Sequence, residues 1–132
     1  MAWFNCPLCE SPSLEICYSM SLGADYRSDE IMVQAVACTG CSFRGVAAYE
    51  ESRRGSMDSE SWDHRASGLA APDYLKLVEL LQACPDRGNE RCSCDSHRTL
   101  GRRDARDRWV GIGQLNIQAP FACFMQRCAH PE

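Results

Sequence analysis

Cysteine is the residue type with the clearest chemistry in this chain, with ten copies in 132 residues. Four of them form two Cys-x-x-Cys pairs, Cys6 with Cys9 and Cys38 with Cys41. Four thiolates arranged in two such pairs can surround one zinc ion tetrahedrally, with zinc–sulfur distances of about 2.3 Å. The spacing therefore predicts a structural metal site formed by these four cysteines.

Other uses of the two pairs fit the sequence less well. A thioredoxin-like redox pair precedes a helix in a βαβ unit, whereas both pairs here lie among strand-like segments. A disulfide framework requires an oxidising compartment, and the N-terminus does not have the pattern of a secretory signal. Iron is an alternative, because the spacing is close to that of rubredoxin. Rubredoxin-like knuckles usually have glycine after the second cysteine of each pair, where this chain has Glu10 and Ser42, so zinc is favoured.

A second cluster of ligand-type residues lies in the C-terminal half. It spans 14 positions and consists of Cys84, Cys92, Cys94 and His97. Cys94 and His97 are three residues apart, which lets both side chains point the same way across one turn. We predict a second zinc site here. Two alternatives are that the cysteines are small buried apolar groups, or that three of the four combine with Cys123, Cys128 or His130.

Neither cluster indicates catalysis. Zinc bound by four protein ligands has no open position for water or substrate. The second cluster also lacks the His-x-Glu and Pro-Cys-x-x-Cys motifs of zinc deaminases. Ser56, Ser59 and Ser61 precede His64, but no Gly-x-Ser-x-Gly motif frames a serine. We therefore expect no enzyme activity, with metal-dependent or thiol-redox chemistry as the least favoured reading.

Strand-like segments surround the first cysteine set. Residues 13–20 alternate, with Leu14, Ile16, Tyr18 and Met20 apolar, as in a half-buried strand. Residues 31–37 and 42–52 are predicted as two further strands. Two cysteine knuckles around a three-stranded antiparallel sheet resemble a zinc ribbon, over residues 1–54. The whole chain is also similar to small bacterial zinc-ribbon proteins of unassigned function, a resemblance that implies no activity.

The remainder, residues 55–132, is predicted to hold one helix and the second cluster, packed with the ribbon as one α+β domain. Residues 55–68 are polar and are expected to form a surface connection. Residues 72–83 have the spacing of an amphipathic helix, with Tyr74, Leu77, Val78 and Leu81 on one face. One further strand is predicted within residues 109–117.

Charge and hydropathy limit the classes of partner. The net charge of −4 argues against broad, non-specific binding to nucleic acid, which requires a basic face. No apolar run approaches the roughly 20 residues of a membrane-spanning helix. The leading hypothesis is a cytoplasmic, non-catalytic adaptor that binds a protein partner or a large assembly.

The alternative hypothesis is a nucleic-acid-binding protein that uses an arginine-rich segment. The residues concerned are Arg98, Arg102, Arg103, Arg106 and Arg108, with Trp109 as a stacking surface. Asp104 and Asp107 lie among these arginines, which favours internal salt bridges instead. The same residues are therefore candidates for nucleic-acid contact or for contact with a protein partner.

Overall fold

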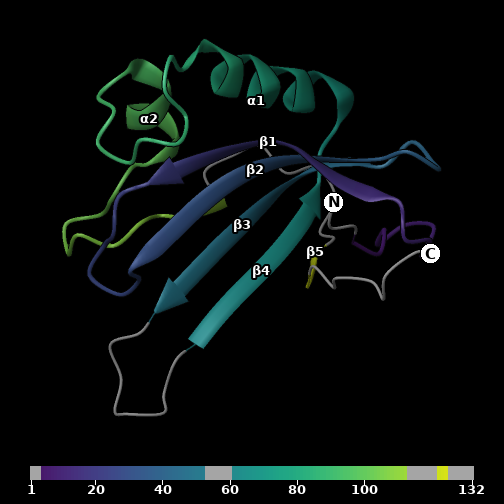
Figure 1. The fold of residues 1–132 in the computed structure, drawn as a ribbon, viewed down its shortest axis with the longest axis horizontal. Helices are drawn as coiled ribbons and strands as arrows, with labels where there is room; N and C mark the ends of the chain where they lie inside the picture. Colours follow the sequence, from purple (N-terminus) through teal and green to yellow (C-terminus); the bar gives the residue numbers. More distant parts are fainter. Residues whose placement is uncertain (1–3, 53–60, 113–121, 125–132) are drawn as a thin grey trace.

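The computed structural model describes residues 4–52, 61–112 and 122–124 and shows an α+β fold (Figure 1). In chain order its elements are β1 (Leu14–Leu22), β2 (Glu30–Cys38), β3 (Arg44–Ser52), β4 (Ser61–Gly68), α1 (Ala71–Ala83), α2 (Asp95–Leu100) and β5 (Ala122–Phe124). The five strands form one antiparallel sheet in the order of the chain. The three-stranded sheet expected from the sequence is therefore extended by β4 and by the three-residue strand β5.

Strand β4 corrects the expectation that residues 55–68 form a surface connection. It pairs with β3 along its whole length, from Gly45 opposite Gly68 to Ser52 opposite Ser61. Its residues alternate, since His64 and Ala66 are buried whereas Arg65 is exposed. Histidine and alanine are weak hydrophobic signals, so the alternation is not visible as a strand pattern in the sequence.

Strand β1 contains a β-bulge that changes which of its residues face the helix. The register shifts between Ile16 and Tyr18, leaving Cys17 as the extra residue, and its side chain is exposed. Leu14 belongs to the cluster on one face of the sheet and Met20 to the cluster on the other. The single apolar side expected for residues 13–20 is thus divided in two by the inserted residue.

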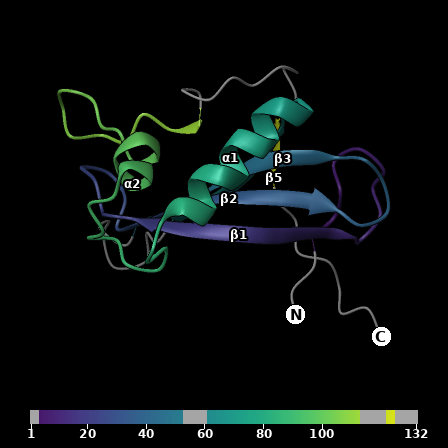
Figure 2. The ribbon, with the colours of Figure 1, turned by 90° about the horizontal axis from the view of Figure 1, so that it is seen from above.

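Helix α1 covers one face of the sheet, lying across β1, β2 and β3 (Figure 2). Leu77 and Leu81 are fully buried against Val33 and Val46, while Tyr74 and Val78 pack at the margin of the same core. The predicted apolar stripe is therefore the face that the helix buries. Pro72 lies in the first turn, where proline is tolerated, and Asp73 places a negative charge near the helix N-terminus.

The opposite face carries no helix in the part of the chain that the structure describes. A second core cluster covers its end nearest the first cysteine set, where Phe4 and Phe43 are buried with Leu14 and Val36. Phe43 lies against Gly45 and Gly68, at which an added Cβ would come 3.1 and 3.4 Å from the ring.

The segment after α2 is anchored to the β1–β2 loop. The Asp25 carboxylate accepts hydrogen bonds from the backbone N–H groups of Arg27, Ser28 and Trp109. Burial raises the pKa of Asp25, but these three donors outweigh burial and hold the pKa below its ordinary value. Within residues 109–112 no strand forms beyond an isolated bridge between Arg103 and Trp109, and residues 113–117 lie outside the described ranges.

Candidate metal centres and the sheet pocket

The first cysteine set comes together at the start of β1 and the end of β2. Its four donor atoms all lie within 4.8 Å of one another. The Sγ atoms of Cys6 and Cys41 are 3.6 Å apart, and those of Cys9 and Cys38 are 3.7 Å apart. Ligands at tetrahedral corners 2.3 Å from one ion would be separated by about 3.8 Å. The sulfur positions therefore fit a tetrahedral metal ion.

Backbone N–H groups point at three of these sulfur atoms. Leu8, Gly40 and Phe43 donate to the Sγ atoms of the cysteines two residues before them, at 3.3 to 3.4 Å. Donors of this kind stabilise thiolate charge. The repeat of the same turn after Cys6, Cys38 and Cys41 is what positions the knuckles.

The thiols of the first set have unequal acidities. Hydrogen bonds from the hydroxyl and the backbone of Ser11 lower the pKa of Cys9 to about 6. The Phe43 N–H lowers the pKa of Cys41, but burial and the three neighbouring thiols outweigh it and raise the pKa to about 12. A divalent cation stabilises all four thiolates together, so metal binding would displace the remaining protons.

The second set assembles where α1 ends and α2 begins. Cys84 is the C-cap residue of α1, and Cys94 is the N-cap residue of α2. The Cys84 and Cys92 sulfur atoms are 3.8 Å apart, and the Nδ1 atom of His97 is 3.2 Å from Cys84 and 3.4 Å from Cys94. Sulfur and nitrogen ligands on one zinc would lie about 3.6 Å apart, so this set also approaches tetrahedral geometry.

The ring of His97 is oriented for metal binding by a distant backbone group. Its Nε2 donates to the carbonyl oxygen of Ser21 in β1, at 3.0 Å. With the proton on Nε2, the lone pair of Nδ1 faces the three cysteines, as in metal sites whose histidine is held by an outer hydrogen bond. The Ser21 N–H also donates to the Arg87 carbonyl at 2.9 Å, so the second set is fastened to the edge strand.

The thiols of the second set also differ in pKa. Burial raises the pKa of Cys84 to about 11. Burial acts on Cys94 too, but hydrogen bonding with His97, first of all from its backbone N–H, outweighs burial and lowers the pKa of Cys94 to about 6. As in the first set, one thiolate is present near neutral pH before any metal binds.

Among the residues that the structure describes, the groups that could hold a metal ion are the two sets predicted from the sequence. They lie at opposite ends of β1, since Cys38 pairs with Leu14 whereas His97 contacts Ser21 (Figure 1). Of the alternative ligands, Cys123 lies in β5, and Cys128 and His130 are outside the described residues. Both sets would be saturated by four protein donors.

The arginine-rich segment has fewer free cations than its composition indicates. Arg98 pairs with Asp95, and Arg103 pairs with Asp107 at 3.1 Å and donates to the Gly23 carbonyl. The other three, Arg102, Arg106 and Arg108, have exposed side chains. Trp109 is a correction to the sequence prediction, because its ring is 6% exposed and its indole N–H donates to Leu100. It is part of the core and offers no stacking surface.

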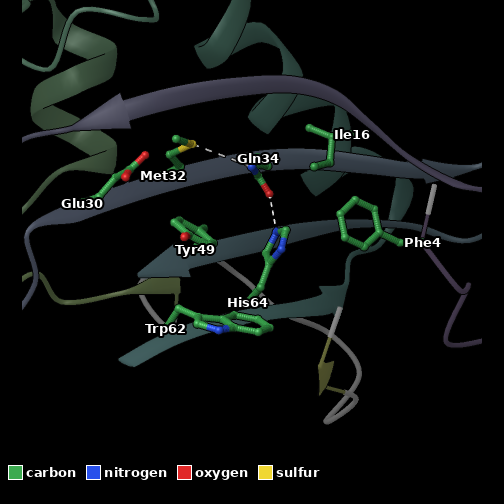
Figure 3. A pocket seen from close by; sticks show the side chains of 8 residues that line it. All are labelled: Phe4, Ile16, Glu30, Met32, Gln34, Tyr49, Trp62 and His64. Carbon is green, nitrogen blue, oxygen red and sulfur yellow. Dashed lines mark hydrogen bonds between the residues drawn. The ribbon is translucent and has the colours of Figure 1, made fainter. Parts of the chain in front are cut away.

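Sequence reasoning did not find a pocket on the face of the sheet away from α1 (Figure 3). It has a volume of about 590 Å³ and is lined by Phe4, Ile16, Glu30, Met32, Gln34, Tyr49, Trp62 and His64. These residues come from the N-terminal segment and from strands β1, β2, β3 and β4. Only the pairing of the strands brings them together. The one signal in the sequence is the aromatic residue Trp62 within the polar segment 55–68.

His64 forms the rigid centre of this pocket. Its Nε2 lies 2.7 Å from Oε1 of Gln34, to which it donates. The rings of Phe4 and Tyr49 contact it edge-on, with centroids 5.3 and 5.4 Å away. His64 and Gln34 are both buried, so their positions are fixed by packing as well as by the hydrogen bond.

Comparison with protein-family models, with curated proteins and with solved structures gives no match. The two Cys/His sets are consistent with a zinc-ribbon-like protein. No helix among the described residues is long and apolar enough to cross a membrane.

Proposed function

We propose that this protein is a non-catalytic zinc-binding adaptor. Two zinc ions fasten the ends of its sheet, and the sheet face away from α1 binds a protein partner. The first part rests on two complete four-ligand sets with near-tetrahedral spacing. Iron fits the same four-sulfur geometry, so zinc at the first set is part of the proposal.

The observation that carries the adaptor role is the pocket that includes Trp62. The Trp62 side chain is 64% exposed and lies at the margin of a hollow in the sheet. Large aromatic side chains beside a pocket are typical anchors of protein interfaces, where tryptophan often contributes more than 2 kcal/mol to binding. An adaptor is expected to have such a surface.

Two features support a role without catalysis. Four protein donors at each metal set leave no position for a reacting molecule. The eight described residues that line the pocket include no serine, threonine, cysteine or lysine nucleophile. The cysteines from Cys6 to Cys94 are all thiols rather than disulfides. Because thiols persist in a reducing compartment, we place the protein in the cytoplasm.

Nucleic-acid binding has less support. The segment from Arg98 to Trp109 uses two of its arginines in contacts with aspartates, and Trp109 is buried. The acidic net charge also opposes approach to phosphate.

Native mass spectrometry of the full chain purified from its own host tests both parts of the proposal. We expect two zinc ions per chain and a bound protein partner. Trp62→Ala should keep both zinc ions and lose the partner, because it removes the interface anchor and no ligand. Leu75→Ala is the matched control, since Leu75 is 62% exposed on α1.

Two results would contradict the proposal. Absence of stoichiometric metal, or a fold that a strong chelator leaves unchanged, removes the zinc-binding part. A partner that survives Trp62→Ala but is lost with Leu75→Ala places the interface on the helix side instead.

A further inference from the structure

We infer that a second hollow, between the β1–β2 loop and strands β3 and β4, binds a phosphoryl group carried by a serine or threonine side chain of another protein. This inference goes beyond the proposed adaptor function, because it concerns a different site and does not depend on Trp62 as an anchor. It follows from three arginines that the fold gathers there and from the groups that hold them.

The hollow lies at the end of the sheet, on the side of α1. Side chains along β3 alternate between the two faces, and Val46 packs against α1. Glu50, four residues further along β3, therefore belongs to the same face and lines the hollow. Trp62 lines both this hollow and the pocket around His64. The hollow has a volume of about 240 Å³, and arginines from three separate segments line it: Arg27, Arg65 and Arg108.

Two of the three arginines have no carboxylate of their own. Nη2 of Arg65 lies 2.8 Å from Oδ2 of Asp63. Among the residues that the structure describes, no carboxylate forms an ion pair with Arg27 or Arg108, and both side chains are exposed. A guanidinium group is planar and always charged, and its N–H groups bind the oxygens of a phosphate in pairs. Two such groups beside one hollow therefore favour an anion with more than two acceptor oxygens.

A buried carboxylate fixes the backbone that carries these two arginines. Asp25 accepts hydrogen bonds from the N–H groups of Arg27 and of Trp109, which directly follows the other arginine, at 2.8 and 2.7 Å. A further bond joins the same two segments, since the Tyr26 N–H donates to the Asp107 carbonyl at 2.9 Å. The two arginine side chains thus extend from one ordered support, which reduces the entropy lost when both close on one anion.

The carboxylates at the hollow limit what kind of phosphate it accepts. Glu50 accepts a hydrogen bond from the Ser28 hydroxyl at 3.4 Å, and Asp63 is paired with Arg65. The Glu50 carboxylate repels further negative charge, so the hollow suits one isolated phosphate better than the continuous phosphates of a nucleic acid. The net charge of −4 acts in the same direction. A phosphorylated serine or threonine carries about −1.5 to −2 charges and three acceptor oxygens, which matches two unpaired guanidinium groups.

NMR titration of the full chain, purified with the metal it carries, tests the inference. The probe is the peptide acetyl-Gly-Gly-phosphoserine-Gly-Gly-amide. We expect it to shift the side-chain Nε–H signals of Arg27 and Arg108. The same peptide with glutamate in place of phosphoserine should bind about fivefold more weakly, because it offers less charge and fewer acceptors. Inorganic phosphate should also bind more weakly, because the peptide adds contacts with the rim, where Trp62 is exposed.

Variants of the chain test the charges directly. Arg27→Gln and Arg108→Gln should each weaken phosphopeptide binding by about fivefold, and Glu50→Gln should strengthen it by about twofold. Arg106→Gln is the matched control, because it removes the same charge from an exposed arginine of the same segment that does not line the hollow. It should leave binding unaltered. An unchanged Trp109 amide signal in each variant shows that the backbone support is intact.

The inference is overturned if the phosphopeptide does not bind, or if the glutamate peptide or inorganic phosphate binds as tightly. It is also overturned if Arg106→Gln weakens binding as much as Arg27→Gln, because the effect would then come from net charge alone. Tighter binding of a thymidine tetranucleotide than of the phosphopeptide would assign the hollow to nucleic acid instead. The Arg27 and Arg108 variants leave the pocket around His64 unchanged, so these results are separate from loss of the partner in Trp62→Ala.

Discussion

Glu10, in the turn that carries Cys6 and Cys9, has a backbone conformation that residues other than glycine rarely adopt. It follows Cys9 directly and has φ of +63°, in the left-handed region. The Glu10 N–H donates to the Cys6 carbonyl at 2.8 Å, which closes the knuckle turn. Glycine, expected at this position in rubredoxin-like knuckles, adopts this conformation without the steric cost that other residues incur.

We therefore predict that Glu10→Gly stabilises the zinc-loaded protein by about 1 kcal/mol. Urea denaturation at a fixed concentration of free zinc measures the free energy of unfolding. Glu79→Gly, within α1, should have the opposite effect and destabilise by about 1 kcal/mol. A loss of stability in the Glu10 variant would show that the glutamate side chain has a role of its own at the knuckle.

At the same scale, the sequence predicted which residues gather in the two Cys/His sets but not what orients them. The eight candidate ligands were recognisable because cysteine and histidine at short spacings have few other uses in a small chain. The contact between His97 and Ser21 spans 76 positions in the sequence. A contact of that kind depends on the path of the whole chain, so no local pattern indicates it.

At the scale of elements, helix α1 was predictable and strand β4 was not. The helix has a strong apolar period and begins near a proline. In β4 the residues on the buried face are His64 and Ala66, and their burial depends on Phe4 and Tyr49, which arrive from other parts of the chain. The pocket was missed for the same reason, because a pocket on a sheet face requires the strand register.

With zinc bound, the second set would hold α1, α2 and the end of β1 together. Cys84→Ser removes one ligand, and we expect the zinc count to fall from two to one. The Ser21 amide, which donates to Arg87, should then exchange with solvent at least about tenfold faster, because bound zinc no longer limits local opening. Native mass spectrometry and hydrogen exchange followed by NMR provide the two measurements.

Two internal controls accompany this prediction. Cys17→Ser alters an exposed cysteine outside both sets and should leave two zinc ions bound. The Leu14 amide, which donates to Phe4 beside the first set, should keep its exchange rate in Cys84→Ser. Equal acceleration at Leu14 and Ser21 would mean that the second set supports global stability rather than one end of the sheet.

At the scale of the whole molecule, the two candidate metal sets lie at opposite ends of the sheet. One joins the N-terminal segment to the β2–β3 turn, and the other joins the helices to the edge strand. The core between them is modest, and a chain of this size buries roughly two-thirds of its unfolded surface. Apparent zinc-binding free energies of about 10 kcal/mol per structural site are of the same order as the net stability of a domain.

Stability of the whole fold should therefore depend on pH through the metal ligands. The lowest thiol pKa in each set, that of Cys9 or Cys94, is about 6. Below this value protons compete for the last thiolate of each set, so zinc affinity falls as the pH falls. We predict two bound zinc ions at pH 7, and loss of both, together with the tertiary structure, by about pH 4. A zinc indicator and near-ultraviolet circular dichroism, recorded on the same acid titration, follow the two events. Cys17→Ser should reproduce the wild-type curve, whereas a tertiary signal that persists after zinc has left would show that the sheet and helix α1 hold together without metal.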